Sequence, residues 1–204
     1  MLLNRFETLL MNNGVRSLVQ RRFEARRLER MGGRVRHGRV LEVGCGRGVG
    51  TEIILDRFEA ERVDAFDLDP RMVALAQKRL AGRGDRIRLT SGDVCAIDAP
   101  DDTYDAVFDF GIVHHVPDWQ AALREIRRVL KPGGRLFAEE VLRRFIHHPI
   151  WRRLLDHPQE NRFDHDRFAA ELAAQGFRVV ATEKMGDWFG WYVADKLVTA
   201  SPVG

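Results

Sequence analysis

The chain has 204 residues, of which 45% are hydrophobic and 31% charged, and its formal net charge is +3. This composition is typical of a globular chain with one full core and argues against a disordered or collagen-like protein. No apolar run approaches the ~18 residues of a membrane span, and the N-terminus lacks a signal-peptide core. We therefore expect a cytoplasmic protein with reduced cysteines at Cys45 and Cys95, and peripheral membrane contact is left open.

The positive charge is concentrated near the N-terminus. Residues 1–39 hold ten arginines against three glutamates, a net charge of +7. Apolar residues at helical spacing, such as Leu18, Phe23 and Leu28, predict two amphipathic helices within residues 4–31, separated at Asn12-Asn13-Gly14. Solvated helix faces would explain the arginines, and so would an anionic partner such as an acidic substrate, a lipid surface or nucleic acid.

Residues 39–50, RVLEVGCGRGVG, have the pattern of a buried strand that runs through a glycine-rich loop into a helix. The strand is expected over 39–44, and the helical pattern begins at Val49 and continues to Phe58. Glycines leave room for backbone N–H groups to approach a ligand closely. The loop glycines are Gly44, Gly46 and Gly48.

The loop does not match a dinucleotide site. The fingerprint G-x-G-x-x-G requires glycine at position 49 or 51, where the chain has Val49 and Thr51. The strand also carries an acid, Glu42, and a carboxylate beside the loop suits a cationic ligand better than a pyrophosphate. The run VLEVGCGRG resembles the first motif of the class I S-adenosylmethionine (SAM) dependent methyltransferases.

The second expected strand, 62–67, ends on an acid. Asp67 stands at its carboxyl end, where open α/β sheets bind ligands, and the resembled family has its ribose-binding acid at this position. Asp69 and Pro70 are residue types typical of the start of a helix, which we expect over 70–81. Helix capping therefore fits Asp69 better than Asp67.

Two more segments resemble the same family. Asp93 and Val94 follow a third strand over 86–91 and match the family's adenine-binding motif, although Gly-Asp is also common in turns. The segment LKPGGRL, residues 130–136, is typical of the turn that leads into the fifth strand of these enzymes. The resemblance extends over roughly residues 35–200.

The order of the expected elements predicts the fold class. Strands alternate with helices until a final helix over 164–175, which is followed by strands over 177–185 and 188–198. We expect an α/β, Rossmann-like, seven-stranded, mostly parallel sheet with a C-terminal antiparallel strand and helices on both faces. Residues 1–34 are interpreted as an N-terminal helical cap and residues 35–204 as the SAM-binding domain.

The resemblance implies SAM as cofactor, with S-adenosyl-L-homocysteine as its product. It also implies a set of cofactor-binding residues: Glu42, Gly44, Cys45, Gly46, Gly48, Asp67, Leu68, Asp93, Val94 and Phe110.

No catalytic residue is assigned from the sequence. His114 and His115, after the fourth strand, are candidates for a general base, although loop histidines more often bond backbone groups. Asp109 departs from the small polar residue that many relatives carry there, so it either meets the substrate or caps the loop. No metal-binding motif such as H-E-x-x-H is present.

We therefore expect a SAM-dependent methyltransferase (EC 2.1.1.-) of the ubiquinone/menaquinone-type, methyltransferase-domain-11 branch. No N-P-P-Y-type tetrapeptide follows the fourth strand, which favours a small-molecule acceptor. An acceptor of anionic or lipid-like character would suit the basic segments. Methylation of RNA or protein, favoured by the basic N-terminus, and a non-catalytic SAM-binding module are the alternatives. The sequence leaves the acceptor atom and the oligomeric state open.

Overall fold

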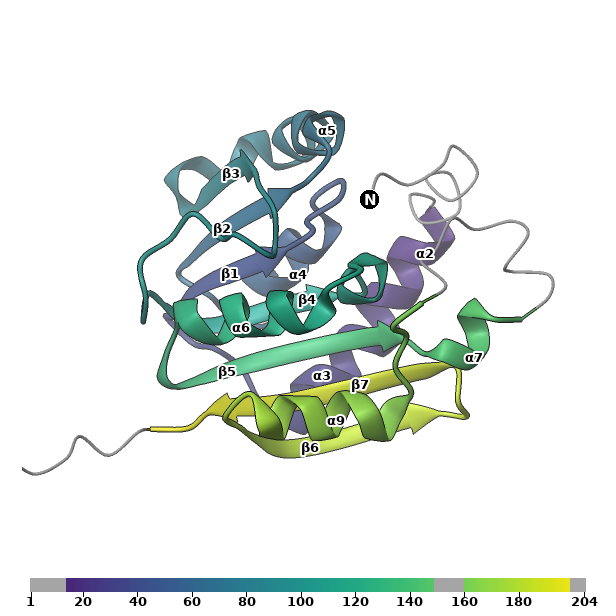
Figure 1. Cartoon of the computed structure of the whole chain (residues 1–204). Coiled ribbons are helices and arrows are strands. Elements are labelled where there is room, and N and C mark those ends of the chain that lie inside the picture. Colours follow the sequence, from purple (N-terminus) through teal and green to yellow (C-terminus); the bar gives the residue numbers. More distant parts are fainter. Residues whose placement is uncertain (1–13, 149–159, 199–204) are drawn as a thin grey trace, which may run out of the picture.

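Seven strands form one sheet with the order β3-β2-β1-β4-β5-β7-β6 in a computed structural model that describes residues 14–148 and 160–198. All neighbouring strands are parallel except where β7 pairs with β5 and β6 (Figure 1). The strands are β1 Arg39–Val43, β2 Arg62–Asp67, β3 Ile87–Ser91, β4 Tyr104–Phe110, β5 Leu130–Val141, β6 Phe177–Met185 and β7 Phe189–Lys196. The expected fold class is confirmed.

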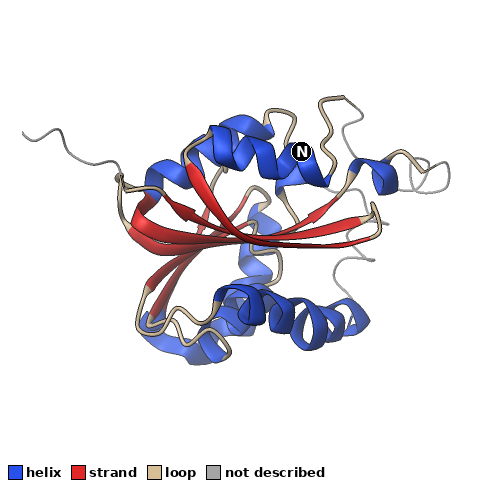
Figure 2. Cartoon of the chain, turned by 90° about the horizontal axis from the view of Figure 1, so that it is seen from below, coloured by secondary structure: helices blue, strands red, loops and turns tan. Residues whose placement is uncertain are grey.

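Helices cover both faces of the sheet (Figure 2). One apolar cluster joins α3, α4 and α5 to the first face, and a second cluster joins α6 and α9 to the other. The helices are α2 Gly14–Val19, a π-helical turn Gln20–Glu24, α3 Ala25–Gly32, α4 Val49–Asp56, α5 Pro70–Leu80, α6 Trp119–Val129, α7 Arg143–Ile146 and α9 His165–Ala174, with 3₁₀ turns at Ala81–Arg86 and Val113–His115.

Aspartates begin three of these helices. The carboxylates of Asp69, Asp118 and Asp164 each accept a bond from a backbone N–H in the first turn of α5, α6 and α9. Since the first N–H groups of a helix have no partner within the helix, these caps define where each helix starts. The capping role expected for Asp69 is confirmed.

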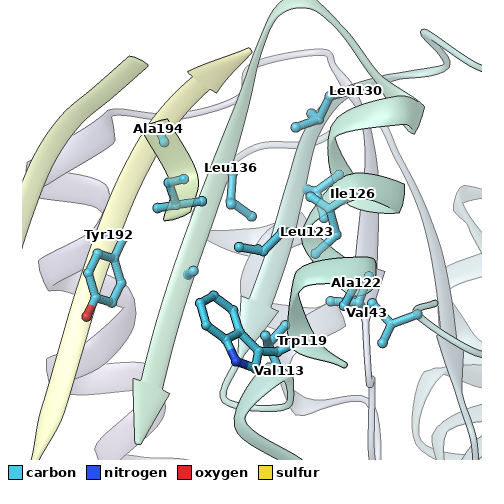
Figure 3. Close-up of a cluster of buried hydrophobic side chains, with 14 of the residues drawn as sticks. Val43, Val113, Trp119, Ala122, Leu123, Ile126, Leu130, Leu136, Tyr192 and Ala194 are labelled. Atoms are coloured by element: carbon cyan, nitrogen blue, oxygen red, sulfur yellow. The ribbon is translucent and has the colours of Figure 1, made fainter. Parts of the chain in front are cut away.

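Aromatic side chains fill the centre of the first face. The ring of Phe108 on β4 lies 4.5 Å from that of Phe137 on β5 and 4.6 Å from that of Phe58. On the opposite face, the apolar stripe of α6 packs against β5, and Tyr192 and Ala194 of β7 belong to the same cluster (Figure 3). The central strands β1, β4 and β5 contribute residues to both clusters, as a sheet buried on both faces requires.

The segment 130–136, expected as the turn into the fifth strand, belongs to β5 itself. The ladder of β5 begins at Leu130, which already pairs with Tyr104. The turn then interrupts the register, with Gly133 at φ +78°, before regular pairing resumes at Arg135. The pairing of β4 with β5 continues to Phe110 and Glu139.

The N-terminal helices bury only part of the apolar face expected from the sequence, since Leu28 is buried and Leu18 and Phe23 are not. Leu18 and Phe23 are 51% and 69% exposed, whereas Ala25 and Leu28 of α3 are fully buried on the sheet. The first expected helix, and the break at Asn12 and Asn13, lie outside the described residues. Among the described helices, none has the length and apolar character needed to cross a membrane.

Arginines of the N-terminal region form ion pairs with acids of the sheet domain and of α3 itself. The solvent-exposed pairs among them contribute little to stability, but all of them offset the local excess of positive charge. The arginines with an acidic partner are Arg16, Arg21, Arg27, Arg30, Arg34, Arg36 and Arg39.

We predict that Phe108→Ala lowers the free energy of unfolding by about 3–5 kcal/mol, because it leaves a cavity among packed aromatic rings. Phe23→Ala, which removes an exposed ring, should change it by no more than about 0.5 kcal/mol. Urea unfolding of the two variants measures the difference. Similar losses would contradict the assignment of the core to β4 and β5.

Candidate functional site

A cavity of about 470 Å³ lies beside the carboxyl ends of β1, β2 and β4. The structure brings nine of the ten residues expected to bind cofactor to its walls, namely Glu42, Gly44, Cys45, Gly46, Asp67, Leu68, Asp93, Val94 and Phe110. Gly48 is not part of the lining. It occupies the N-cap position of α4 with φ +80° and so turns the chain from the loop into the helix.

The glycine loop closes one side of the cavity. At Gly44, a Cβ atom would lie 2.3 Å from Cγ2 of Ile112, so only glycine permits this contact. Gly46 has φ +50°, and its N–H points to Oδ2 of Asp67 at 2.8 Å. The loop therefore folds back onto the end of the neighbouring strand.

Asp67 holds two loops together at the end of β2. Oδ2 accepts the N–H of Gly46, and Oδ1 accepts the N–H of Asp69 at 2.9 Å. Burial raises the pKa of Asp67, and the two backbone bonds oppose that shift. Each carboxylate oxygen can accept a second hydrogen bond, so a ligand hydroxyl in the cavity can still be bound.

Glu42 is 1% exposed although it carries a titratable group. The Thr51 hydroxyl donates to its Oε2, and a Cβ atom at Gly50 would lie 2.0 Å from its Oε1. Glycine at 50 is therefore what allows α4 to pack on this carboxyl group. Burial, with a smaller contribution from the charge of Asp67, raises the pKa of Glu42 to about 8.

Asp93 and Val94 form the wall after β3. The Asp93 carboxylate is exposed to the cavity and accepts the N–H of Cys95 at 2.8 Å. Val94 is 5% exposed and packs into the adjoining core. An acidic acceptor and an apolar surface thus lie side by side.

The N-terminal helices contribute residues that sequence reasoning did not select. Arg16, Ser17 and Gln20 line the cavity from α2 and the π-helical turn. Arg16 is held by ion pairs with Glu24 and with Glu139 of β5. The sequence signal that could have identified these three residues is a set of polar residues at positions i, i+1 and i+4 of a helix. Many solvent-facing helices show the same pattern.

The three catalytic candidates occupy different places. His115 lines the cavity, whereas His114 and Asp109 are 1% exposed and do not. Nδ1 of His114 lies 2.6 Å from Oε2 of Glu140, and Oδ1 of Asp109 accepts the N–H groups of the two residues at the start of the following loop. Asp109 therefore caps the loop that follows β4.

Residues 40–134 match a family model described as a methyltransferase domain. The chain is 35% identical over 103 residues to a demethylmenaquinone methyltransferase of Thermus thermophilus, covering 50% of the chain and 46% of that protein. It is also 35% identical over 119 residues to a malonyl-[acyl-carrier protein] O-methyltransferase of Halorhodospira halophila, covering 58% of the chain and 40% of that protein. The chain thus spans less than half the length of these curated relatives.

Solved structures share the fold. A SAM-dependent methyltransferase from Aquifex aeolicus superimposes with a TM-score of 0.72 at 20% identity, covering 93% of this chain and 97% of that one. The sequence match lies over the segment that carries the glycine loop, Asp67 and Asp93, and the fold match extends over nearly the whole chain. The resemblance to class I SAM-dependent methyltransferases is thereby confirmed over residues 40–134, which match a methyltransferase domain.

Proposed function

We propose that this protein transfers a methyl group from SAM to a small-molecule acceptor. The observation that carries the proposal is the meeting of Glu42, Asp67 and Asp93 at one cavity, beside a loop of bare glycine backbone. Three acids on one cavity wall favour a ligand that combines positive charge with hydroxyl and amine donors.

The described residues fit such a ligand group by group. Asp67, oriented by two backbone N–H groups, would accept bonds from the ribose hydroxyls. Asp93 would accept the exocyclic amine of the adenine, and Val94 would pack on the ring. Glu42 would give up its proton beside the positive charge at the methionine end and then balance that charge, and Gly44 and Gly46 leave space there for the ligand.

Bound SAM supplies a methyl group that its sulfonium has already activated. The protein's task is then to hold the acceptor in line with that group and to exclude water, which can contribute about 7–11 kcal/mol to a well-aligned reaction. A base is required only for an acceptor that arrives protonated. Of the three candidates, His115 has the position to meet such an acceptor, since it lines the cavity.

Three arguments support a small-molecule acceptor. Relatives named for demethylmenaquinone and malonyl-[acyl-carrier protein] support a small or carrier-linked acceptor, and Ile112 and Val116 give the far wall an apolar surface for a lipid-like one. Methylation of RNA or protein rests on the basic N-terminus, but arginines there pair with the protein's own acids. The proposal also includes a cytoplasmic location and contact with a membrane surface. It further divides the chain into an N-terminal helical cap, residues 1–34, and a SAM-binding domain, residues 35–204.

We predict that SAM and S-adenosyl-L-homocysteine raise the melting temperature by roughly 5–10 °C at ligand concentrations about 100-fold above Kd, because they bind only the folded state. NAD at the same concentration should leave it unchanged. A shift with NAD alone would contradict the proposal. A shift with SAM but no methyl transfer to quinol, carboxylic acid or RNA acceptors would favour the non-catalytic module.

We predict that Asp67→Ala weakens SAM binding at least about tenfold, since it removes charged acceptors for the ribose. Asp69→Ala should instead lower the free energy of unfolding by about 1 kcal/mol through loss of a helix cap, with SAM affinity nearly unchanged. Titration calorimetry and urea unfolding separate the two effects. Equal losses of affinity would contradict the role given to Asp67.

The raised pKa of Glu42 predicts how stability depends on pH. Between about pH 4.3 and about pH 8, the unfolded chain has lost this proton while the folded protein keeps it, so stability falls as pH rises through that window. Glu42→Gln should remove this loss, and its advantage over the wild type should grow by at most about 1.4 kcal/mol per pH unit and level off above about pH 8. The exposed Glu61→Gln is the matched control in urea unfolding. A constant difference between wild type and Glu42→Gln at all pH values would refute the buried, protonated state.

A further inference from the structure

Two buried carboxyl groups hold the loop that follows β4. Asp109 on β4 and Glu140 on β5 are 1% and 0% exposed, and neither lines the cavity. Together they accept four consecutive backbone N–H groups. Gly111 and Ile112 donate to Oδ1 of Asp109 at 3.1 and 2.9 Å, and Val113 and His114 donate to Oε1 and Oε2 of Glu140 at 3.0 and 3.1 Å.

A buried guanidinium holds the same loop from the carbonyl side. Arg162, which is 3% exposed, donates to the carbonyl oxygens of His114 and of Val116. Ile112, His115 and Val116 of this loop line the cavity, and Ile112 packs directly on Gly44. The position of one cavity wall, and its contact with the glycine loop, therefore depends on the buried side chains of Asp109, Glu140 and Arg162.

The pair needs a proton. Asp109 and Glu140 lie on the same face of neighbouring strands, because Asp109 pairs with Ala138, two residues before Glu140. Their carboxyl groups accept adjacent N–H groups of one loop, and Oδ2 of Asp109 meets no hydrogen-bond donor among the described residues. Glu140, by contrast, faces the Nδ1 atom of His114 as well as two backbone N–H groups, and these donors favour its ionised form. Burial and then the charge of Glu140 raise the pKa of Asp109 well above its usual value, and burial raises that of Glu140 to about 7.

We propose that Asp109 and Glu140 share one proton, carried on Oδ2 of Asp109 and donated to Glu140, and that this pair positions residues 111–116 as a wall of the cavity. The inference deepens the proposed function and gives these acids a positioning role, because neither touches the cavity. The pair then carries one negative charge, which Arg162 balances.

Other titratable groups surround the pair. Glu139 precedes Glu140 on β5. Tyr192 of β7, and Arg162 and His114 of the loops, interact electrostatically with Glu140. Above the pH at which the shared proton leaves, two adjacent buried charges repel each other. The loop should then loosen and the cavity wall should move from Gly44.

Because of the shared proton, replacing the carboxyl group by an amide should have different effects at Asp109 and at Glu140. In Asp109→Asn, an N–H replaces the carboxyl O–H as donor to Glu140, while Oδ1 still accepts Gly111 and Ile112. In Glu140→Gln, an amide NH₂ takes the place of one acceptor, so either Val113 or His114 points its N–H at a donor. Asp109→Asn should therefore preserve the loop, and Glu140→Gln should disrupt it.

The test measures the affinity for S-adenosyl-L-homocysteine by calorimetry between about pH 6 and about pH 9, with the exposed Asp85→Asn as matched control. Near pH 7 we expect Asp109→Asn to bind within about threefold of the wild type and Glu140→Gln at least about tenfold more weakly. Towards pH 9 the wild type and Asp85→Asn should lose affinity, whereas Asp109→Asn should keep it. Equal behaviour of Asp109→Asn and Glu140→Gln, or a wild-type pH profile in Asp109→Asn, would overturn the shared proton.

Amide hydrogen exchange of residues 111–114 in the ligand-free protein separates this inference from the proposed function. Protection should persist in Asp109→Asn and fall at least about tenfold in Glu140→Gln. If the wild type binds no S-adenosyl-L-homocysteine but shows this exchange pattern, the proposed function fails and the proton-sharing pair stands. Equal protection in both variants would overturn the positioning role, and Asp109→Asn alone decides the matter if Glu140→Gln does not fold.

Discussion

Carboxyl groups buried at the rim of the sheet are the constraint on which the structure of this site depends. A carboxylate removed from water must gain hydrogen bonds, an opposite charge or a proton, because its desolvation is otherwise too costly. Each strand end near the cavity meets this requirement differently. Glu42 accepts a hydrogen bond from a hydroxyl group and has a raised pKa. Asp67 accepts hydrogen bonds from two backbone N–H groups. Glu139 accepts hydrogen bonds from Arg16 and from the indole N–H of Trp191.

These requirements also determine the shape of the loops. Because Asp67 accepts the N–H of Gly46, the glycine loop turns toward β2, and because Asp109 and Glu140 accept four N–H groups in a row, the next loop lies against Gly44. The glycine loop has no regular secondary structure before α4, and the loop after β4 has only the short 3₁₀ turn Val113–His115 to satisfy its backbone. The acids of the strand ends replace that structure and leave the cavity walls fixed before any ligand arrives.

Adjacent residues on β5 connect the cavity to both layers of helices. Glu139 faces the N-terminal helices, where Arg16 of α2 binds it, and it also accepts the indole N–H of Trp191 on β7. Glu140 faces the loop before α6. Alternation along a strand requires this split. The N-terminal arginines thus have partners within the protein, and Arg16 brings the α2 helix onto the cavity through one of these acids.

Local signals in the sequence determined the sheet, its parallel order and most of the residues around the cavity. Alternating strands and helices, the glycine loop, the acid at 67 and the LKPGG turn each depend on neighbours within a few residues, so they can be read from the chain alone. Only the tertiary structure decided that Leu18 and Phe23 are exposed, that Arg16 lines the cavity, and that Asp109 and Glu140 hold the same loop. The last two facts depend on contacts between distant segments, 123 residues apart for Arg16 with Glu139 and 27 for Val113 with Glu140, and no periodicity in the sequence specifies such contacts.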